Sequence, residues 1–176
     1  MFFVLRASQH VPEFYQQALL FSPVEQRRFR DEFQQQVHEL QTEVAKRQRF
    51  ETTLTEEQIN GWLATTVTEE HAHKLPRGMS DPRVSLEDGK ARIGCRYQKG
   101  RIDTVVWLTA EVRLIGQANL LEIRLRGLKA GNLPFSLEQF QAKITSAFQR
   151  AKMTVQWVEG TSDLKARVQL PNRFEG

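Results

Sequence analysis

Alternation of apolar and polar side chains between residues 84 and 125 is the feature that most limits the folds open to this chain. In the longest stretch, residues 102–114, the even-numbered positions are all apolar except Thr104. Polar residues, namely Thr109, Glu111 and Arg113, occupy odd-numbered positions between them. A period of two is typical of a β-strand and not of an amphipathic helix. Because glycine-containing turns separate the alternating runs, the region predicts an antiparallel meander of at least four strands with one polar face.

The length of the strand at 102–114 predicts a curved sheet. At the usual rise it would be roughly 43 Å long, and sheets of that length twist and coil. We expect an amphipathic helix over residues 136–152 to fill the concave side, and residues 153–158 and 164–170 to form a C-terminal hairpin. The fold class is therefore α+β, with N-terminal helices, then a long curved antiparallel β-meander packed on one amphipathic helix.

Three helical segments are expected before the sheet: a short amphipathic turn or helix over residues 11–21, and helices over residues 22–47 and 55–73. Ser22 with Glu25, and Thr55 with Gln58, are spaced as capping boxes at the starts of the second and third helices. The second helix has one narrow apolar stripe, so it lies on a surface or pairs with one partner. We divide the chain into an N-terminal helical arm, residues 1–49, and an α+β domain, residues 50–176.

The first five residues, MFFVL, leave two interpretations open. They are too few for a membrane-spanning helix or a signal peptide, which need apolar runs of about 20 and about 7–15 residues. Either the protein is soluble as written, or the arm follows a membrane anchor that was trimmed.

Residues suited to catalysis or metal binding do not form a recognisable constellation. Cys95 lies on the apolar side of a strand and is expected to act as a small hydrophobic residue. His71 and His73 stand two residues apart without a further Cys or His cluster, which favours a solvated helix end over a metal site. We therefore expect no enzymatic activity, no metal and no cofactor.

The basic residues of the first hairpins form a second candidate site. The formal charge of +4 comes from 25 basic and 21 acidic residues, which indicates a mixed surface and not a dedicated nucleic-acid surface. Basic residues nonetheless cluster around the first hairpins, namely Arg83, Arg92, Arg96, Lys99 and Arg101, and the expected anion contacts are the last four of these. Because Tyr97 points away from Arg92 and Arg96, we do not expect a nucleic-acid partner.

Trp107 and Val105 interrupt the polar face of the long strand. Either the N-terminal helix covers them or they form an exposed partner site. We favour the first interpretation.

Three short segments carry a resemblance to a known family. They are TLTEEQINGWL at 53–63, PRVSLEDGKARI at 82–93 and GNLPF at 131–135. Over about residues 50–170 the chain resembles the bacterial YpmS-like domain of unknown function, and it is similar to half-modules of the tubular lipid-binding (BPI-like) superfamily. The resemblance implies a curved antiparallel sheet around a helix and an envelope location behind a membrane anchor, and it does not cover the helix at 22–47.

These observations give one leading function and two alternatives. The leading expectation is a non-enzymatic, envelope-associated module that binds a lipid or other apolar ligand, or scaffolds a membrane partner. Its expected apolar lining is Val106, Leu108, Val112, Phe140 and Phe148. These side chains could equally pack on one another and leave no cavity. The alternatives are a protein-interaction or homodimerisation module that uses the 22–47 helix, and, as the weaker one, a domain that binds an anion or nucleic acid through Arg83–Arg101. Without the resemblance, a cytoplasmic location is expected.

Overall fold

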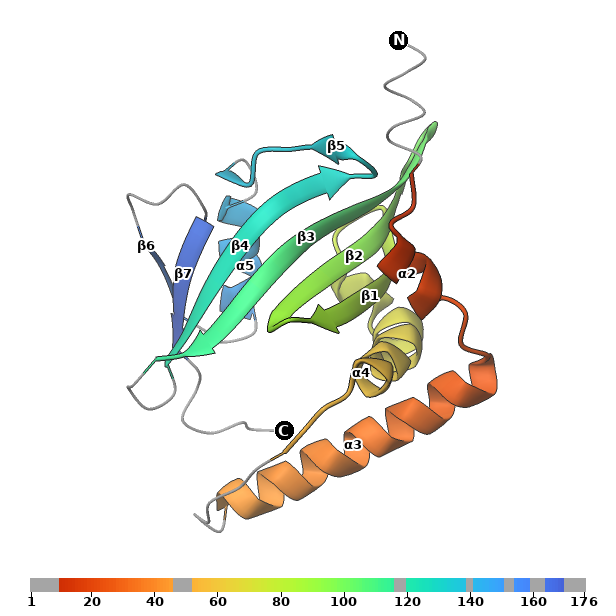
Figure 1. The fold of residues 1–176 in the computed structure, drawn as a ribbon, viewed down its shortest axis with the longest axis vertical. Helices are drawn as coiled ribbons and strands as arrows, with labels where there is room; N and C mark the ends of the chain where they lie inside the picture. The colour runs from red at the N-terminus through yellow and green to blue at the C-terminus, as the bar shows by residue number, and fades with distance from the viewer. Residues whose placement is uncertain are drawn as a thin grey trace.

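A computed structural model describes residues 10–45, 52–115, 120–138, 141–150, 154–158 and 164–169. The fold is α+β, as predicted: N-terminal helices precede a seven-stranded antiparallel sheet (Figure 1). The helical elements are α2 (Glu13–Ala18), α3 (Pro23–Ala45), α4 (Glu56–Trp62), η1 (Leu63–Glu70), η2 (Ala72–Lys74) and α5 (Gln141–Arg150). The strands are β1 (Met79–Glu87), β2 (Lys90–Lys99), β3 (Ile102–Leu114), β4 (Leu120–Ala130), β5 (Leu133–Pro134), β6 (Thr154–Val158) and β7 (Leu164–Gln169).

The strand order is β1-β2-β3-β4-β7-β6, with β5 paired to β4. The meander of four strands is confirmed, and β3 has the predicted bounds. The C-terminal hairpin is also confirmed, and β7 pairs with β4, so the hairpin extends the main sheet. The predicted turns at 116–119 and 159–163, like residues 1–5, lie outside the described residues.

Two strands extend into segments predicted as loops. β1 begins at Met79, within residues 74–82, whose prolines, glycine and Ser-Asp pair predict a loop, and it contains Asp81 (φ 48°) and Pro82 at a register shift. An edge strand tolerates proline because its outward N–H need not pair. β4 continues past Gly127, whose φ of +60° lies at a second register shift. A glycine there permits a β-bulge. β4 therefore continues beyond the alternating residues and ends at Ala130.

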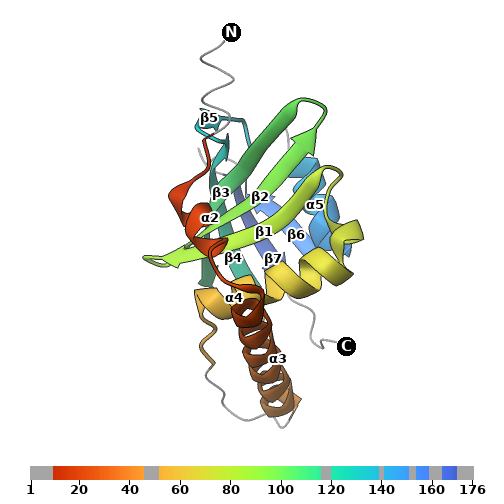
Figure 2. The same ribbon diagram turned by 90° about the vertical axis from the view of Figure 1, so that its right-hand side faces the viewer.

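Helical elements cover both faces of the sheet (Figures 1 and 2). α2 lies on one face, where Phe14 and Tyr15 pack on Val105. On the opposite face, α5 packs on β6, and the Trp157 indole N–H donates to Thr145 Oγ1 at 2.8 Å. η1 packs on β1, on the same side of the sheet as α5.

The predicted start of α5 at Ser136 is wrong. Leu137 and Glu138 precede the helix in non-α conformations, and the described helix runs from Gln141 to Arg150. The Ser136 hydroxyl lies 3.4 Å from the Glu138 carboxylate. The bond that a Ser136 cap would accept from the N–H of residue 139 lies outside the described residues.

Both predicted capping boxes are confirmed. Ser22 and Glu25 bond each other at the start of α3, and Thr55 and Gln58 do so at the start of α4. The single helix expected over 55–73 is wrong beyond Trp62, where the chain changes to a π-helix at Leu63–Glu70 and then to a 3₁₀ turn. In this region the Thr68 hydroxyl donates to the Leu63 carbonyl, five residues earlier, at 2.9 Å.

α4 also seals the free edge of β1. The Asn60 side chain accepts from the Val84 N–H and donates to the Val84 carbonyl, each at 2.8 Å. The Leu86 N–H donates to the Glu56 carboxylate at 2.7 Å. These side chains take the place of a neighbouring strand, which protects an edge that could otherwise pair with another chain.

Candidate functional site: an apolar strip across the sheet

The face of the sheet that carries α5 and η1 has a row of apolar side chains across β1, β2 and β3. Directly opposed residues of an antiparallel pair share a face. Ile93 stands opposite Leu108, and Val106 stands opposite Cys95 and Ala130. We define the apolar strip as Leu86, Ile93, Val106, Leu108 and Val112.

The strip is more exposed than the apolar residues on either side of it. Next to η1, Val84 is 6% exposed, and toward α5, Leu125 is 7% exposed. Between them, Ile93 is 41% exposed and Val112 is 50% exposed. Large apolar side chains are therefore open to solvent in the middle of a sheet face whose two ends are covered.

The structure brings together the strand residues of the predicted lining. Val106 and Leu108 are half-buried neighbours on one face of β3, and Val112 lies further along it, opposite Ile123. Phe140 and the side chain of Phe148 lie outside the described residues. Sequence reasoning missed Leu86 and Ile93, although both belong to alternating runs, because the pairing of β1, β2 and β3 was needed to place them beside Leu108.

Cys95 is a titratable group at the strip. Burial raises the pKa of its thiol to about 11. The thiol is therefore protonated at neutral pH, so it adds neither charge nor a thiolate nucleophile to this apolar surface.

The opposite face confirms the structural interpretation of Trp107. α2 covers Val105, which is 3% exposed, and Phe14 lies 5.9 Å from the Trp107 ring in an edge contact. The Trp107 indole N–H donates to the Gly131 carbonyl at 2.9 Å. Gly94 allows α2 to approach, because a Cβ there would lie 3.0 Å from the Tyr15 ring.

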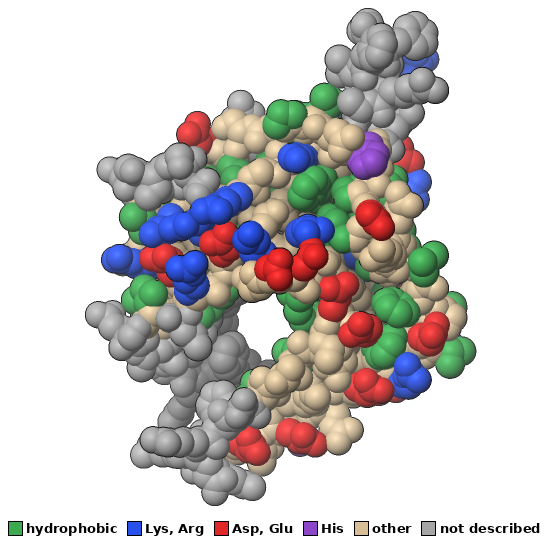
Figure 3. Space-filling model, viewed as in Figure 1, with side chains coloured by type: hydrophobic (Ala, Val, Ile, Leu, Met, Phe, Trp, Pro, Cys, Tyr) green, Lys and Arg blue, Asp and Glu red, His purple; other side chains and the backbone are tan. Residues whose placement is uncertain are grey.

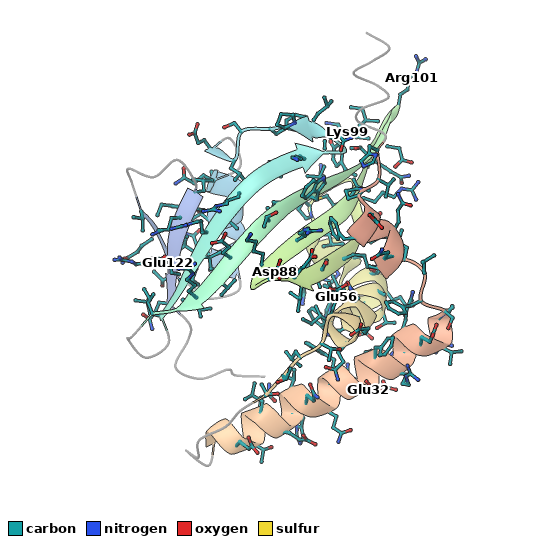
Figure 4. The ribbon with its side chains drawn as sticks, in the orientation of Figure 1. Glu32, Glu56, Asp88, Lys99, Arg101 and Glu122 are labelled. Atoms are coloured by element: carbon teal, nitrogen blue, oxygen red, sulfur yellow. The ribbon has the colours of Figure 1, made fainter. Side chains whose placement is uncertain are left out.

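The predicted anion contacts do not form one surface with Arg83. Arg83 is 4% exposed beneath α2, and its guanidinium donates to the Pro82 carbonyl at 2.7 Å. Arg92 pairs with Glu87. Lys99 and Arg101 are exposed at the tip of the β2–β3 hairpin (Figure 4).

Arg96 is held by a carboxylate on the next strand. It donates two hydrogen bonds to Asp103, at 2.9 and 2.7 Å, and Gln98 donates a third at 3.0 Å. These bonds lower the pKa of Asp103 to about 2 and raise the pKa of Arg96. A ligand anion at Arg96 would have to compete with this internal partner.

A buried polar cluster under α2 was not foreseen. The Tyr15 hydroxyl donates to the Asp81 carbonyl oxygen at 2.6 Å, and Tyr15 is 2% exposed. Burial, followed by the nearby Asp81, raises the pKa of Tyr15 to about 12, and burial lowers the pKa of Arg83. The sequence signal was weak, because Asp81 lies in a segment that reads as a loop. The cluster ties α2 to the start of β1.

Ionisation of Tyr15 is expected to destabilise the fold above pH 10. Its folded pKa of about 12 exceeds the ordinary tyrosine value of about 10. Between these values the unfolded chain loses a proton that the folded chain keeps, so the free energy of unfolding falls by roughly 2–3 kcal/mol. Below pH 10 the contribution is fully present. Urea unfolding of wild type and Tyr15→Phe from pH 9 to 12 measures this loss of stability. The thiol of Cys95 also ionises in this range, but it is present in both proteins and affects both alike. Parallel stability profiles of the two proteins against pH would contradict the prediction.

Comparison with protein-family models, with curated proteins and with solved structures finds no match to this chain. The resemblance to the YpmS-like domain therefore stays a prediction.

Across the described residues, every helix is too short or too polar to cross a bilayer. In the same residues, no three His, Cys, Asp or Glu side chains cluster in a way that could hold a metal ion. The rings of His71 and His73 meet edge to face with centroids 6.2 Å apart, at the 3₁₀ turn instead of a regular helix.

Proposed function

We propose that the protein is a non-enzymatic binding module that holds a lipid acyl chain, or an apolar segment of similar shape, on the apolar strip. The supporting observation is the exposure of Ile93 and Val112, 41% and 50%, between the covered ends of one sheet face. Burial of apolar surface contributes about 25 cal/mol per Å², so an extended hydrocarbon chain laid across three strands would bind favourably. The uncharged Cys95 thiol is compatible with such a ligand.

The structure gives this proposal a matched pair of variants. Ile93 and Ile102 are both exposed isoleucines, on neighbouring strands of one hairpin, and Ile102 is 54% exposed near the hairpin tip. Only Ile93 belongs to the strip. Lysine at either position can extend its charge into water, so both variants should fold.

Ile93→Lys is expected to weaken binding of a fatty acid at least about tenfold, because the ligand must desolvate a charge or lose contact with the strip. Fluorescence titration with cis-parinaric acid, a fatty acid that is bright in apolar sites, measures the affinity. Ile102→Lys should bind as wild type does. No saturable binding by wild type would contradict the proposal and favour a strip whose side chains close on one another. Equal losses in both variants would also contradict it.

A second candidate function is self-association through α3. All of its side chains whose exposure is described are partly or fully exposed, although the helix spans Pro23–Ala45. Phe29 and Phe33 contact α4, whereas Val37 and Leu40 remain half-exposed further along the same stripe. If α3 forms a dimer, light scattering should give twice the monomer mass for wild type and the monomer mass for Leu40→Glu. A monomer in both cases would exclude this function.

A further inference from the structure

A group of basic side chains covers the α2 face of the sheet over β3, β4 and β7 (Figure 3). This face is opposite to the apolar strip, because Arg113 and Arg124 alternate with Val112 and Ile123 along their strands. We call the group the basic array: Arg113, Arg124, Arg126, Lys165 and Arg167.

The strand register spreads these charges in two dimensions. Arg124 stands between Glu111 on β3 and Lys165 on β7, and Glu122 stands between Arg113 and Arg167. Neighbouring strands lie roughly 4.8 Å apart, and alternate residues along a strand roughly 6.8 Å apart. The array is therefore a sheet of charge and not a single line.

The two glutamates of this region lie deeper than Arg113 and Arg126, whereas Lys165, at 18% exposed, is as covered as the glutamates. The side chains of Glu111 and Glu122 are 12% and 17% exposed, whereas those of Arg113 and Arg126 are 70% and 41% exposed. Glu111 pairs with Arg126 at 3.1 Å, and Glu122 pairs with Lys165 at 3.2 Å. An approaching body therefore meets Arg113 and Arg126 before the carboxylates.

Two arginines of the array form no close ion pair with a described residue, although each stands opposite a glutamate on the next strand. Among the described residues, neither Arg124 nor Arg167 has a carboxylate oxygen within 4 Å. The array and its two glutamates carry an excess of three positive charges, most of the +4 of the whole chain. Like charges this close repel one another, so an anionic partner would be bound favourably.

We infer that the basic array docks the protein on the surface of an anionic phospholipid bilayer. A bilayer presents phosphates in a plane, which matches a two-dimensional array, and arginine binds phosphate in a bidentate manner. Single-stranded nucleic acid would need exposed aromatic rings for stacking. The aromatic side chain that β3, β4 and β7 place on this face, Trp107, is instead covered by Phe14 and Lys129. This inference goes beyond the proposed function, since it concerns the other face of the sheet.

Co-sedimentation with phosphatidylcholine vesicles, with and without phosphatidylglycerol, tests the inference. Wild type is expected to bind only the vesicles that contain phosphatidylglycerol, and binding should weaken with salt. Arg124→Gln/Arg167→Gln should reduce the partition constant by about fivefold per charge, or roughly 25-fold. The control Arg27→Gln/Arg28→Gln removes two exposed charges from α3 and should stay near wild type.

A second measurement does not depend on the variants. Phenylglyoxal modification of wild type, read by mass spectrometry, should show Arg124 and Arg167 protected by phosphatidylglycerol vesicles and Arg27 unprotected. Equal losses in the two double variants, or no protection at the array, would overturn the inference. Binding to duplex or single-stranded nucleic acid but not to vesicles would overturn it as well. Fatty-acid binding by the array variant should be unchanged, which separates this test from that of the apolar strip.

Discussion

Gly61→Ala is expected to destabilise the protein by about 2–3 kcal/mol, although alanine is the better helix former by about 1 kcal/mol. A Cβ at position 61 would lie 2.5 Å from Phe29 Cβ and 2.8 Å from both the Arg30 backbone nitrogen and the Gln26 carbonyl oxygen. Backbone atoms cannot rotate away, so α3 and α4 would have to separate. The stacked rings of Phe33 and Trp62, 5.3 Å apart, would lose contact.

Urea unfolding measures this effect, and Gly100→Ala serves as the control. Gly100 has a φ of +60° and no atom within 4 Å of the added Cβ. Alanine there costs only backbone strain, about 1 kcal/mol. A stabilised Gly61→Ala protein would show that α3 does not cross α4 as closely as described.

Asn60→Leu is expected to cost about 4 kcal/mol. Asn60 is 2% exposed and makes both hydrogen bonds to the Val84 backbone. Leucine has a similar volume but leaves a buried N–H and a buried carbonyl unsatisfied, at about 1–3 kcal/mol for each group. Hydrogen exchange should also show that the Val84 amide loses its protection.

Glu56→Ala is the matched control at the same edge of β1. Its partner, the Leu86 N–H, belongs to an exposed residue, so water replaces the lost bond and the cost stays under about 1 kcal/mol. Similar costs for Asn60→Leu and Glu56→Ala would contradict the view that α4 seals the buried part of this edge.

Local patterns predicted most elements of the fold. The alternation at 102–114 fixed the whole of β3, and two reciprocal caps, at Ser22 and Thr55, marked the starts of α3 and α4. Each of these signals involves residues close in sequence, which is why no knowledge of tertiary packing was required. The bulge at Gly127 and the π-helix after Trp62 depend on neighbouring elements, so the sequence did not reveal them.

The sequence predicted which residues of β3 line the candidate site, but not which residues of the neighbouring strands lie beside them. Val106 and Leu108 follow from the period of one strand, but their proximity to Ile93 depends on the β2–β3 register. The cover on Trp107 was foreseen from the apolar N-terminal segment, whereas the tie between Tyr15 and Asp81 joins residues 66 positions apart. Long-range polar contacts of this kind leave no periodic trace in a sequence.

Methyl NMR with a spin-labelled fatty acid is the sharpest test of whether the apolar strip binds an apolar ligand. The methyl signals of Ile93 and Val112 are expected to broaden as the ligand is added, while those of the exposed Leu20, between α2 and α3, and Val24, in the first turn of α3, stay sharp. Broadening at Leu20 and Val24 with no change at Ile93 would place the ligand away from the apolar strip and contradict the proposed function.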